Sequence, residues 1–77
     1  MTIGETNLLN KKAQTRKDGV YSFKDTMFVV KDNKFIAFAD CYGNCFQRFG
    51  SFNVSIGEVD RHDRRQKLSK WLKTQYK

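Results

Sequence analysis

Runs of β-branched and aromatic residues, each five to eight residues long, fill the middle of the chain. Turn-forming pairs such as Asp18-Gly19 and Asp32-Asn33 separate these runs. Short strands with brief connections are typical of an antiparallel meander, in which strands that follow one another along the chain pair in the sheet. We therefore expect three or four strands, at residues 20–24, 26–31, 34–40 and 45–52.

Both faces of this sheet carry large apolar side chains. Alternation along residues 34–40 places Phe35 and Ala37 on one face and Ile36 and Phe38 on the other. An antiparallel sheet with one solvated face would show polar residues on that side. We therefore expect a helix over one face, and the N-terminal segment or a partner over part of the other.

The C-terminal segment has the pattern of an amphipathic helix over residues 61–76. Asp60 is a suitable N-cap, because a carboxylate there accepts hydrogen bonds from the backbone N–H groups of the first turn. At 100° per residue, Leu68 and Trp71 fall within one apolar stripe that suits a helix lying across a sheet. The stripe needs only the second half of this helix. The first half is a cluster of arginines, to which the segment itself offers one carboxylate, Asp63.

Residues 1–18 show no sustained period and are rich in Asn, Thr, Lys and Gln, so we expect a flexible basic arm there. Residues 19–77 then form a single α+β domain, a small antiparallel three- to four-stranded meander packed on one C-terminal helix. A chain of 77 residues leaves room for one small core. No segment approaches the roughly 18 apolar residues that a membrane-spanning helix needs, and the start lacks a secretory pattern, so we expect a cytoplasmic protein.

The charge of the chain lies at its two ends. Fifteen Lys and Arg residues against eight Asp and Glu give a net charge of +7, and residues 61–77 hold seven of the basic residues and one acidic residue. All seven Phe residues lie between the basic ends. Apolar burial and phosphate contact would then use different residues, which favours a nucleic-acid ligand. The alternative is that the basic ends keep a small, Phe-rich protein soluble.

Residues with reactive side chains are few. Cys41 and Cys45 flank a hairpin tip where a disulfide is geometrically conceivable, but without an export signal two free thiols are favoured. These thiols and the single His62 make a poor zinc set. Catalysis by His62 would need a Ser, Cys or paired carboxylates beside it, and the sequence places only aspartates there. We therefore expect no catalytic residue, no metal and no cofactor.

The segment KFIAFADCYGNCFQRFGSF, residues 34–52, resembles part of a known group of DNA-binding domains. These domains, in plant ethylene-response factors, phage homing-endonuclease accessory domains and the arm-binding domains of tyrosine integrases, consist of a three-stranded sheet and a helix. Residues 19–20, 34–37 and 50–52 match their Gly-Val, Lys-aromatic-x-Ala and Gly-x-Phe motifs, and the resemblance covers about residues 19–52. It implies a sheet face lying in the major groove, with contacts from Lys24, Lys31, Lys34, Gln47 and Arg48.

Two hypotheses about function follow. The first is a small, basic, non-enzymatic nucleic-acid-binding regulator of phage or mobile-element type, with DNA favoured over RNA. The N-terminal arm and the last helix would contact phosphates, the sheet would read bases, and exposed rings such as Tyr21, Phe23 and Tyr42 would stack on them. The second is a phage-encoded inhibitor or adaptor that binds an acidic patch on a host enzyme. In either case we expect a monomer or a dimer formed through an unpaired edge strand.

The first hypothesis makes a specific demand on the arginines that begin the last helix. Arg61, Arg64 and Arg65 should contribute most to phosphate binding, because guanidinium groups match phosphate geometry and the cluster has few acidic neighbours. Pairing of these arginines with carboxylates elsewhere in the molecule would remove the argument. The candidate nucleic-acid-binding residues are Lys11, Lys12, Arg16, Lys17, Lys24, Lys31, Lys34, Gln47, Arg48, Arg61, Arg64, Arg65, Lys67, Lys70 and Lys73.

Overall fold

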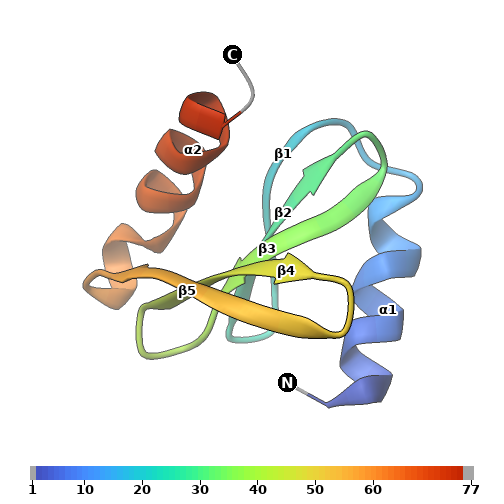
Figure 1. The fold of residues 1–77 in the computed structure, drawn as a ribbon, viewed down its shortest axis with the longest axis horizontal. Helices are drawn as coiled ribbons and strands as arrows, with labels where there is room; N and C mark the ends of the chain where they lie inside the picture. Colours follow the sequence, from blue (N-terminus) through green and yellow to red (C-terminus); the bar gives the residue numbers. More distant parts are fainter. Residues whose placement is uncertain (1, 76–77) are drawn as a thin grey trace.

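A computed structural model describes residues 2–75 of the chain. Its five strands form one antiparallel sheet whose order follows the sequence, and a helix lies on each side of the sheet (Figure 1). The elements are α1 (Ile3–Ala13), β1 (Gly19–Phe23), β2 (Thr26–Lys31), β3 (Lys34–Ala39), β4 (Asn44–Phe49), β5 (Phe52–Glu58), a short 3-10 helix η1 (Arg61–Asp63) and α2 (Arg64–Gln75). The predicted α+β class is confirmed, with five strands where three or four were expected.

The extra strand comes from residues 45–52, which were expected to form one strand. They contain instead most of β4 and the first residue of β5, with a turn at Gly50-Ser51 between the two strands. Gly50 has φ +60, a left-handed conformation that glycine adopts without a Cβ clash. Phe49 and Phe52 pair across this turn, and their rings stack with centroids 5.9 Å apart.

The second difference is at the N-terminus, where the expectation of a flexible arm is wrong. Residues Ile3–Ala13 form α1, which begins at an N-cap, Thr2, whose hydroxyl accepts a hydrogen bond of 3.1 Å from the backbone N–H of Glu5. Only Leu9 and Ala13 of α1 are buried, one turn apart on the face that meets the sheet. The helix therefore covers the second face of the sheet, the role that the sequence left open between this segment and a partner.

Two hydrophobic clusters lie on the two faces of the sheet. Strand β2 contributes to both, because its successive side chains point to opposite faces and all four residues from Met27 to Val30 are buried. On the α1 side the buried residues are Leu9, Ala13, Phe28, Val30, Phe35 and Phe38. On the α2 side they are Met27, Val29, Ala37, Ala39, Cys45 and Leu68.

A bulge in β3 corrects the expected assignment of faces. Val29 pairs with Ala37 while Val30 pairs with Phe35, so Ile36 is an extra residue in the strand. Phe35 and Phe38 therefore lie in the same cluster, with ring centroids 5.9 Å apart, although simple alternation places them on opposite faces.

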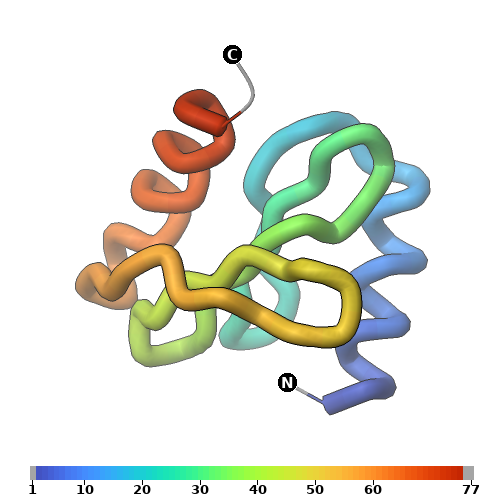
Figure 2. The backbone as a smooth tube through the Cα atoms, viewed as in Figure 1, coloured from blue at the N-terminus to red at the C-terminus, as the bar shows by residue number. Residues whose placement is uncertain are grey.

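The segment that leads into α2 docks against the β3–β4 turn, as the neighbouring yellow-green and orange parts of the chain show in Figure 2. The backbone N–H of Val59 donates to the carbonyl of Gly43 at 3.0 Å. Asp60 then caps η1 by accepting from the backbone N–H of His62 at 2.9 Å, as the sequence predicts. Leu68 anchors α2 to the sheet and is fully buried. Residue 76, the predicted end of the helix, lies outside the described residues.

Candidate nucleic-acid interface

The arginines at the start of α2 bind main-chain carbonyls of the sheet. Arg64 Nη1 donates to the carbonyl oxygens of Asp25 at 2.5 Å and Asp40 at 2.9 Å, and Arg65 Nη1 donates to that of Val20 at 2.7 Å. Both side chains therefore hold α2 against β1 and against the β1–β2 and β3–β4 turns. Their partners are neutral peptide groups, so neither guanidinium loses its net charge.

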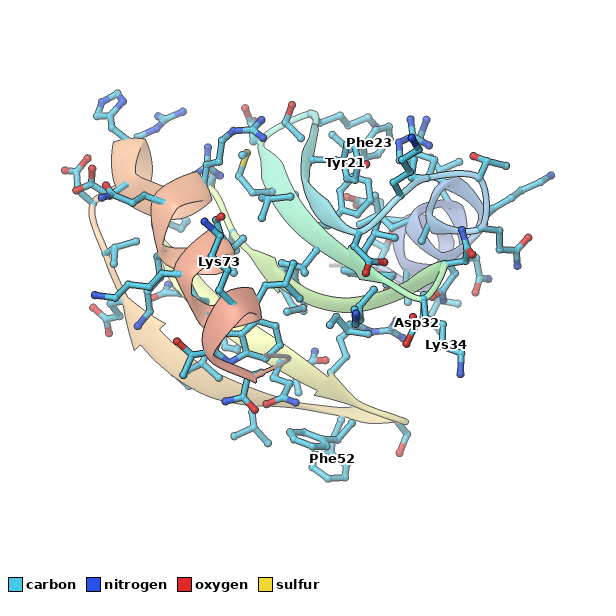
Figure 3. The ribbon with its side chains drawn as sticks, turned by 90° about the horizontal axis from the view of Figure 1, so that it is seen from above. Tyr21, Phe23, Asp32, Lys34, Phe52 and Lys73 are labelled. Atoms are coloured by element: carbon cyan, nitrogen blue, oxygen red, sulfur yellow. The ribbon has the colours of Figure 1, made fainter. Side chains whose placement is uncertain are left out.

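Cations from α1, from the loop that follows it and from the β1–β2 turn lie over two aromatic rings of β1. Lys12 Nζ is 5.1 Å and Lys24 Nζ 5.5 Å from the centroid of the Phe23 ring, and Arg16 Cζ is 5.6 Å from that of Tyr21. These distances are typical of cation–π contacts. Figure 3 shows both rings between β1 and α1, where they also pack against the core cluster of that side.

We call the resulting feature the β1 surface. It joins residues from three separate parts of the sequence on one edge strand of the sheet and its turn. Within residues 2–75, none of its cations forms an ion pair; the one such pair found there is Lys31 with Asp18 at 3.0 Å. The β1 surface consists of the cations Lys12, Arg16, Lys24, Arg64 and Arg65 and the rings Tyr21 and Phe23.

A shallow hollow continues the β1 surface toward η1. It is lined by Asp25 of the β1–β2 turn, by Tyr42 of the β3–β4 turn and by Arg61 of η1, among others. Tyr42 is 81% exposed, so its ring is accessible as a stacking platform. Both Asp25 and Asp60 also line the hollow, which makes it less positive than the β1 surface itself.

The structure places the other predicted lysines around the molecule. Lys11 and Lys17 are exposed, and the carbonyl of Lys17 accepts from the Tyr21 hydroxyl at 2.8 Å. Lys31 and Lys34 lie at the opposite end of β2 from Lys24, in and beside the β2–β3 turn. Lys67, Lys70 and Lys73 lie along α2, where the first two line shallow surface hollows.

Lys31 differs from the other predicted lysines because it forms an ion pair with Asp18. The Asp18 carboxylate accepts from the backbone N–H of Asp32 at 2.9 Å and from Lys31 Nζ at 3.0 Å. These two contacts, the backbone one first, hold the pKa of Asp18 below its usual range. Lys31 is therefore committed to this turn and is a poor candidate for a phosphate contact.

Arg48 has a structural role that the sequence did not indicate. Its Nη1 donates to the carbonyl of Phe35 at 2.9 Å and to Asn10 Oδ1 at 3.1 Å, and its guanidinium carbon lies 4.5 Å from the Phe35 ring centroid. Burial lowers the pKa of Arg48. The side chain thus links α1 to the sheet, while Gln47, the next residue along β4, is half-buried.

The family resemblance implies that five residues share one sheet face that lies in the DNA groove, and their positions in the structure can be compared with that expectation. Lys24 and Lys34 are exposed at opposite ends of the sheet, and Arg48 lies beneath α1. Helices pack on both faces of the central strands. The five residues implied by the resemblance therefore do not form one surface, whereas an edge strand with its turn does.

The two cysteines and the single histidine lie in and beside the β3–β4 turn and in η1. Cys41 and Cys45 are free thiols, and burial raises the pKa of the Cys45 thiol. His62 is exposed in η1. Over the described range, no three His, Cys, Asp or Glu side chains are grouped so that they would hold a metal ion.

Comparison with known protein families, characterised proteins and solved structures finds no match to this chain. Neither helix in the described part of the chain is long and apolar enough to cross a membrane.

Proposed function

We propose that the protein is a small, non-enzymatic nucleic-acid-binding regulator that contacts its ligand through the β1 surface. One observation carries this proposal: three cations lie over the two aromatic rings of one edge strand, Arg64 and Arg65 hydrogen-bond to the same strand and its turn, and none of the five has an ion-pair partner among residues 2–75. Half-buried aromatic rings beside cations are what single strands need, since bases stack on the rings while phosphates meet the cations. DNA is the favoured ligand, in a protein of phage or mobile-element type, as the sequence suggests.

The arginines of α2 and the lysines near Phe23 would have different parts in binding. Arg64 and Arg65 are held by main-chain carbonyls, so they present a fixed positive charge at little further cost in side-chain entropy. Lys12 and Lys24 cover the Phe23 ring and would move aside, placing their ammonium groups on phosphates while a base takes the ring face.

The proposal predicts how steeply the binding constant falls as the salt concentration rises. Each phosphate that a protein neutralises changes the slope of log K against log salt by about −0.9 on duplex DNA and about −0.7 on single strands. If all five cations of the β1 surface contact phosphates, the slope is about −4.5 on duplex and about −3.5 on single strands. Single-strand affinity should exceed duplex affinity if the rings stack on bases.

The test is fluorescence anisotropy with labelled single-stranded and duplex oligonucleotides over a range of salt concentrations. The double variant Lys12→Gln/Lys24→Gln should flatten the slope by about 1.4 on single strands, since two phosphate contacts are lost. The control is Lys34→Gln/Lys73→Gln, which removes the same charge at exposed positions away from the β1 surface (Figure 3). Equal losses in both variants would show that only net charge matters and would refute the site.

A second candidate function rests on a different observation. Phe49, Phe52 and Val54 of the β4–β5 hairpin are 43%, 60% and 43% exposed. Three neighbouring apolar side chains on a protruding hairpin favour docking to another protein, as expected of an inhibitor or adaptor. Capture from a nuclease-treated lysate distinguishes the candidates: a stoichiometric protein partner lost in Phe52→Ser supports this one, and recovery of nucleic acid alone from untreated lysate opposes it.

A further inference from the structure

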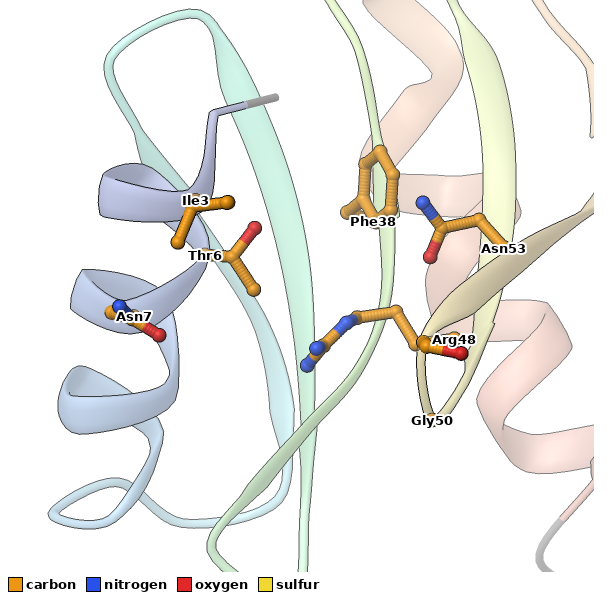
Figure 4. A pocket seen from close by; sticks show the side chains of 8 residues that line it. Ile3, Thr6, Asn7, Phe38, Arg48, Gly50 and Asn53 are labelled. Carbon is orange, nitrogen blue, oxygen red and sulfur yellow. The ribbon is translucent and has the colours of Figure 1, made fainter.

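A cavity of about 260 Å³ lies between the N-terminal half of α1 and the β4–β5 hairpin. It is on the α1 side of the sheet, near the end of α1 opposite to Lys12 and Arg16. Figure 4 shows the Arg48 side chain extending from the sheet toward α1 between the two walls. The lining used below comprises Ile3, Thr6 and Asn7 from α1 and Phe38, Arg48 and Asn53 from the sheet.

Arg48 brings an unbalanced positive charge with unused donors to this cavity. Both of its hydrogen bonds leave from Nη1, to Phe35 and Asn10, so Nε and Nη2 have no acceptor among residues 2–75. No buried side-chain nitrogen or oxygen in that range lacks a partner, so these N–H groups are reachable from solvent. Charges that are removed from water are normally paired with an opposite charge or fully hydrogen-bonded. Here the opposite charge is absent from the described residues, and a bound anion would supply it.

The other residues that line the cavity indicate which kind of anion it would bind. Asn7, Asn53 and Thr6 are uncharged and offer both donors and acceptors, as groups that recognise the edge of a nucleobase do. Phe38 is 7% exposed and its ring stacks on Phe46, so it contributes an apolar ring edge to the wall. The volume is just below the range of about 300–1,000 Å³ for drug-sized ligands, so it suits one small unit and excludes a duplex.

We infer that this cavity is a binding site for a single nucleotide carrying a 5′-phosphate, with the phosphate on Arg48 and the base between the asparagines and the exposed edge of Phe38. The inference is independent of the β1 surface, because it uses other residues at the other end of α1. The nucleotide comes either from the pool of free mononucleotides or from the 5′-phosphorylated end of a strand. Both sources present the same phosphate and base to the cavity.

The test is titration of the ¹⁵N-labelled protein with deoxynucleoside 5′-monophosphates, inorganic phosphate and unphosphorylated nucleosides. The mononucleotides should show saturable binding at one site, with affinity about tenfold or more above that of phosphate or nucleoside alone, because the phosphate and base contacts act together. Asn53→Phe should fill the cavity and lower the affinity by about tenfold or more. The matched control is Ser55→Phe, which places the same ring two residues further along β5 at an exposed position that does not line the cavity.

The outcomes separate this site from the proposed function. Mononucleotide binding that persists in Lys12→Gln/Lys24→Gln supports the cavity, and loss in that variant overturns it. Phosphate binding as tightly as mononucleotides, equal binding by Asn53→Phe and wild type, or absence of saturable binding also overturns it. Oligonucleotides with and without a 5′-phosphate identify the source of the ligand. If the 5′-phosphorylated oligonucleotide binds more tightly and Asn53→Phe removes this difference, the ligand is the end of a strand. If the two oligonucleotides bind equally while mononucleotides bind the cavity, the ligand is the free nucleotide.

Discussion

The contact between Gly43 and Val59 should control how firmly α2 is held on the sheet. Gly43 has φ +95, and a Cβ placed on it would lie 1.8 Å from the carbonyl oxygen of Val59. The substitution Gly43→Ala must therefore move the segment that leads into α2 by more than 1 Å to reach even the 3.0 Å that real Cβ atoms essentially never go below. That movement breaks the hydrogen bond from Val59 to Gly43 and loosens the arginines of the β1 surface.

The chain offers a matched control in Gly50→Ala. Gly50 has φ +60 and no atom within 4 Å of an added Cβ, so its substitution carries the conformational cost alone, about 1–2 kcal/mol. Gly43→Ala carries a similar backbone cost plus the loss of the docked segment, so we expect about 3 kcal/mol or more. A chain of 77 residues has a total free energy of unfolding of about 4–12 kcal/mol, so this loss is a large fraction of it.

Urea unfolding followed by the fluorescence of the single tryptophan, Trp71 of α2, measures both free energies. Gly43→Ala should unfold at clearly lower urea than Gly50→Ala and should also bind nucleic acid more weakly. If the two variants lose equal stability, the segment at Val59 does not dock against the turn and the positions assigned to Arg64 and Arg65 lose their support.

Two further predictions concern the same end of the molecule. Burial acts to raise the pKa of Asp40, but hydrogen bonds from the Asn44 side chain and from the backbone N–H groups of Asn44, Tyr42 and Gly43 outweigh it and lower that pKa. This carboxylate therefore stabilises the fold above about pH 4 and loses that effect as the pH falls through its folded-state pKa. In urea titrations at acid pH, the free energy of unfolding of Asp40→Asn should therefore fall less steeply with decreasing pH than that of the wild type. Arg65→Met should reduce the salt slope of DNA binding by about 0.7–0.9 while the helical circular dichroism stays unchanged, and an unchanged slope would exclude Arg65 from the interface.

The first three strands could be predicted from the sequence because each combines a run of β-branched or aromatic residues with a turn former at its end. Their observed bounds differ by one residue at most from the predicted ranges. The β4–β5 hairpin was missed although Gly50-Ser51 is a two-residue hairpin pair, because phenylalanines on both sides of the pair made residues 45–52 read as one continuous strand.

Helix α1 could not be predicted because its apolar signal is too small. Only Leu9 and Ala13 face the core, and the remaining positions are polar or exposed, so no stripe is visible along the sequence. Its burial depends on a sheet face formed by residues far along the chain. The same holds for the bulge at Ile36, which exists only in the pairing of β2 with β3.

The candidate cations could be identified one by one, but their grouping could not. Lys12 and Lys24 meet only because Phe23 lies between α1 and the β1–β2 turn. Arg65 joins them through a carbonyl 45 residues away, a contact that depends on where α2 docks. The charge of Arg48 gave no sign of its structural role, which is to link α1 to the sheet through Asn10 and the Phe35 carbonyl.

The most direct test of the account is the binding footprint of a short single-stranded oligonucleotide in ¹H–¹⁵N spectra of the wild-type protein. The account predicts the largest changes at Tyr21, Phe23 and Lys24 of the sheet edge and at Arg65 of α2, with the amides of the β4–β5 hairpin almost unmoved. Changes concentrated at Phe52 and its neighbours, with the edge at β1 unaffected, would contradict it.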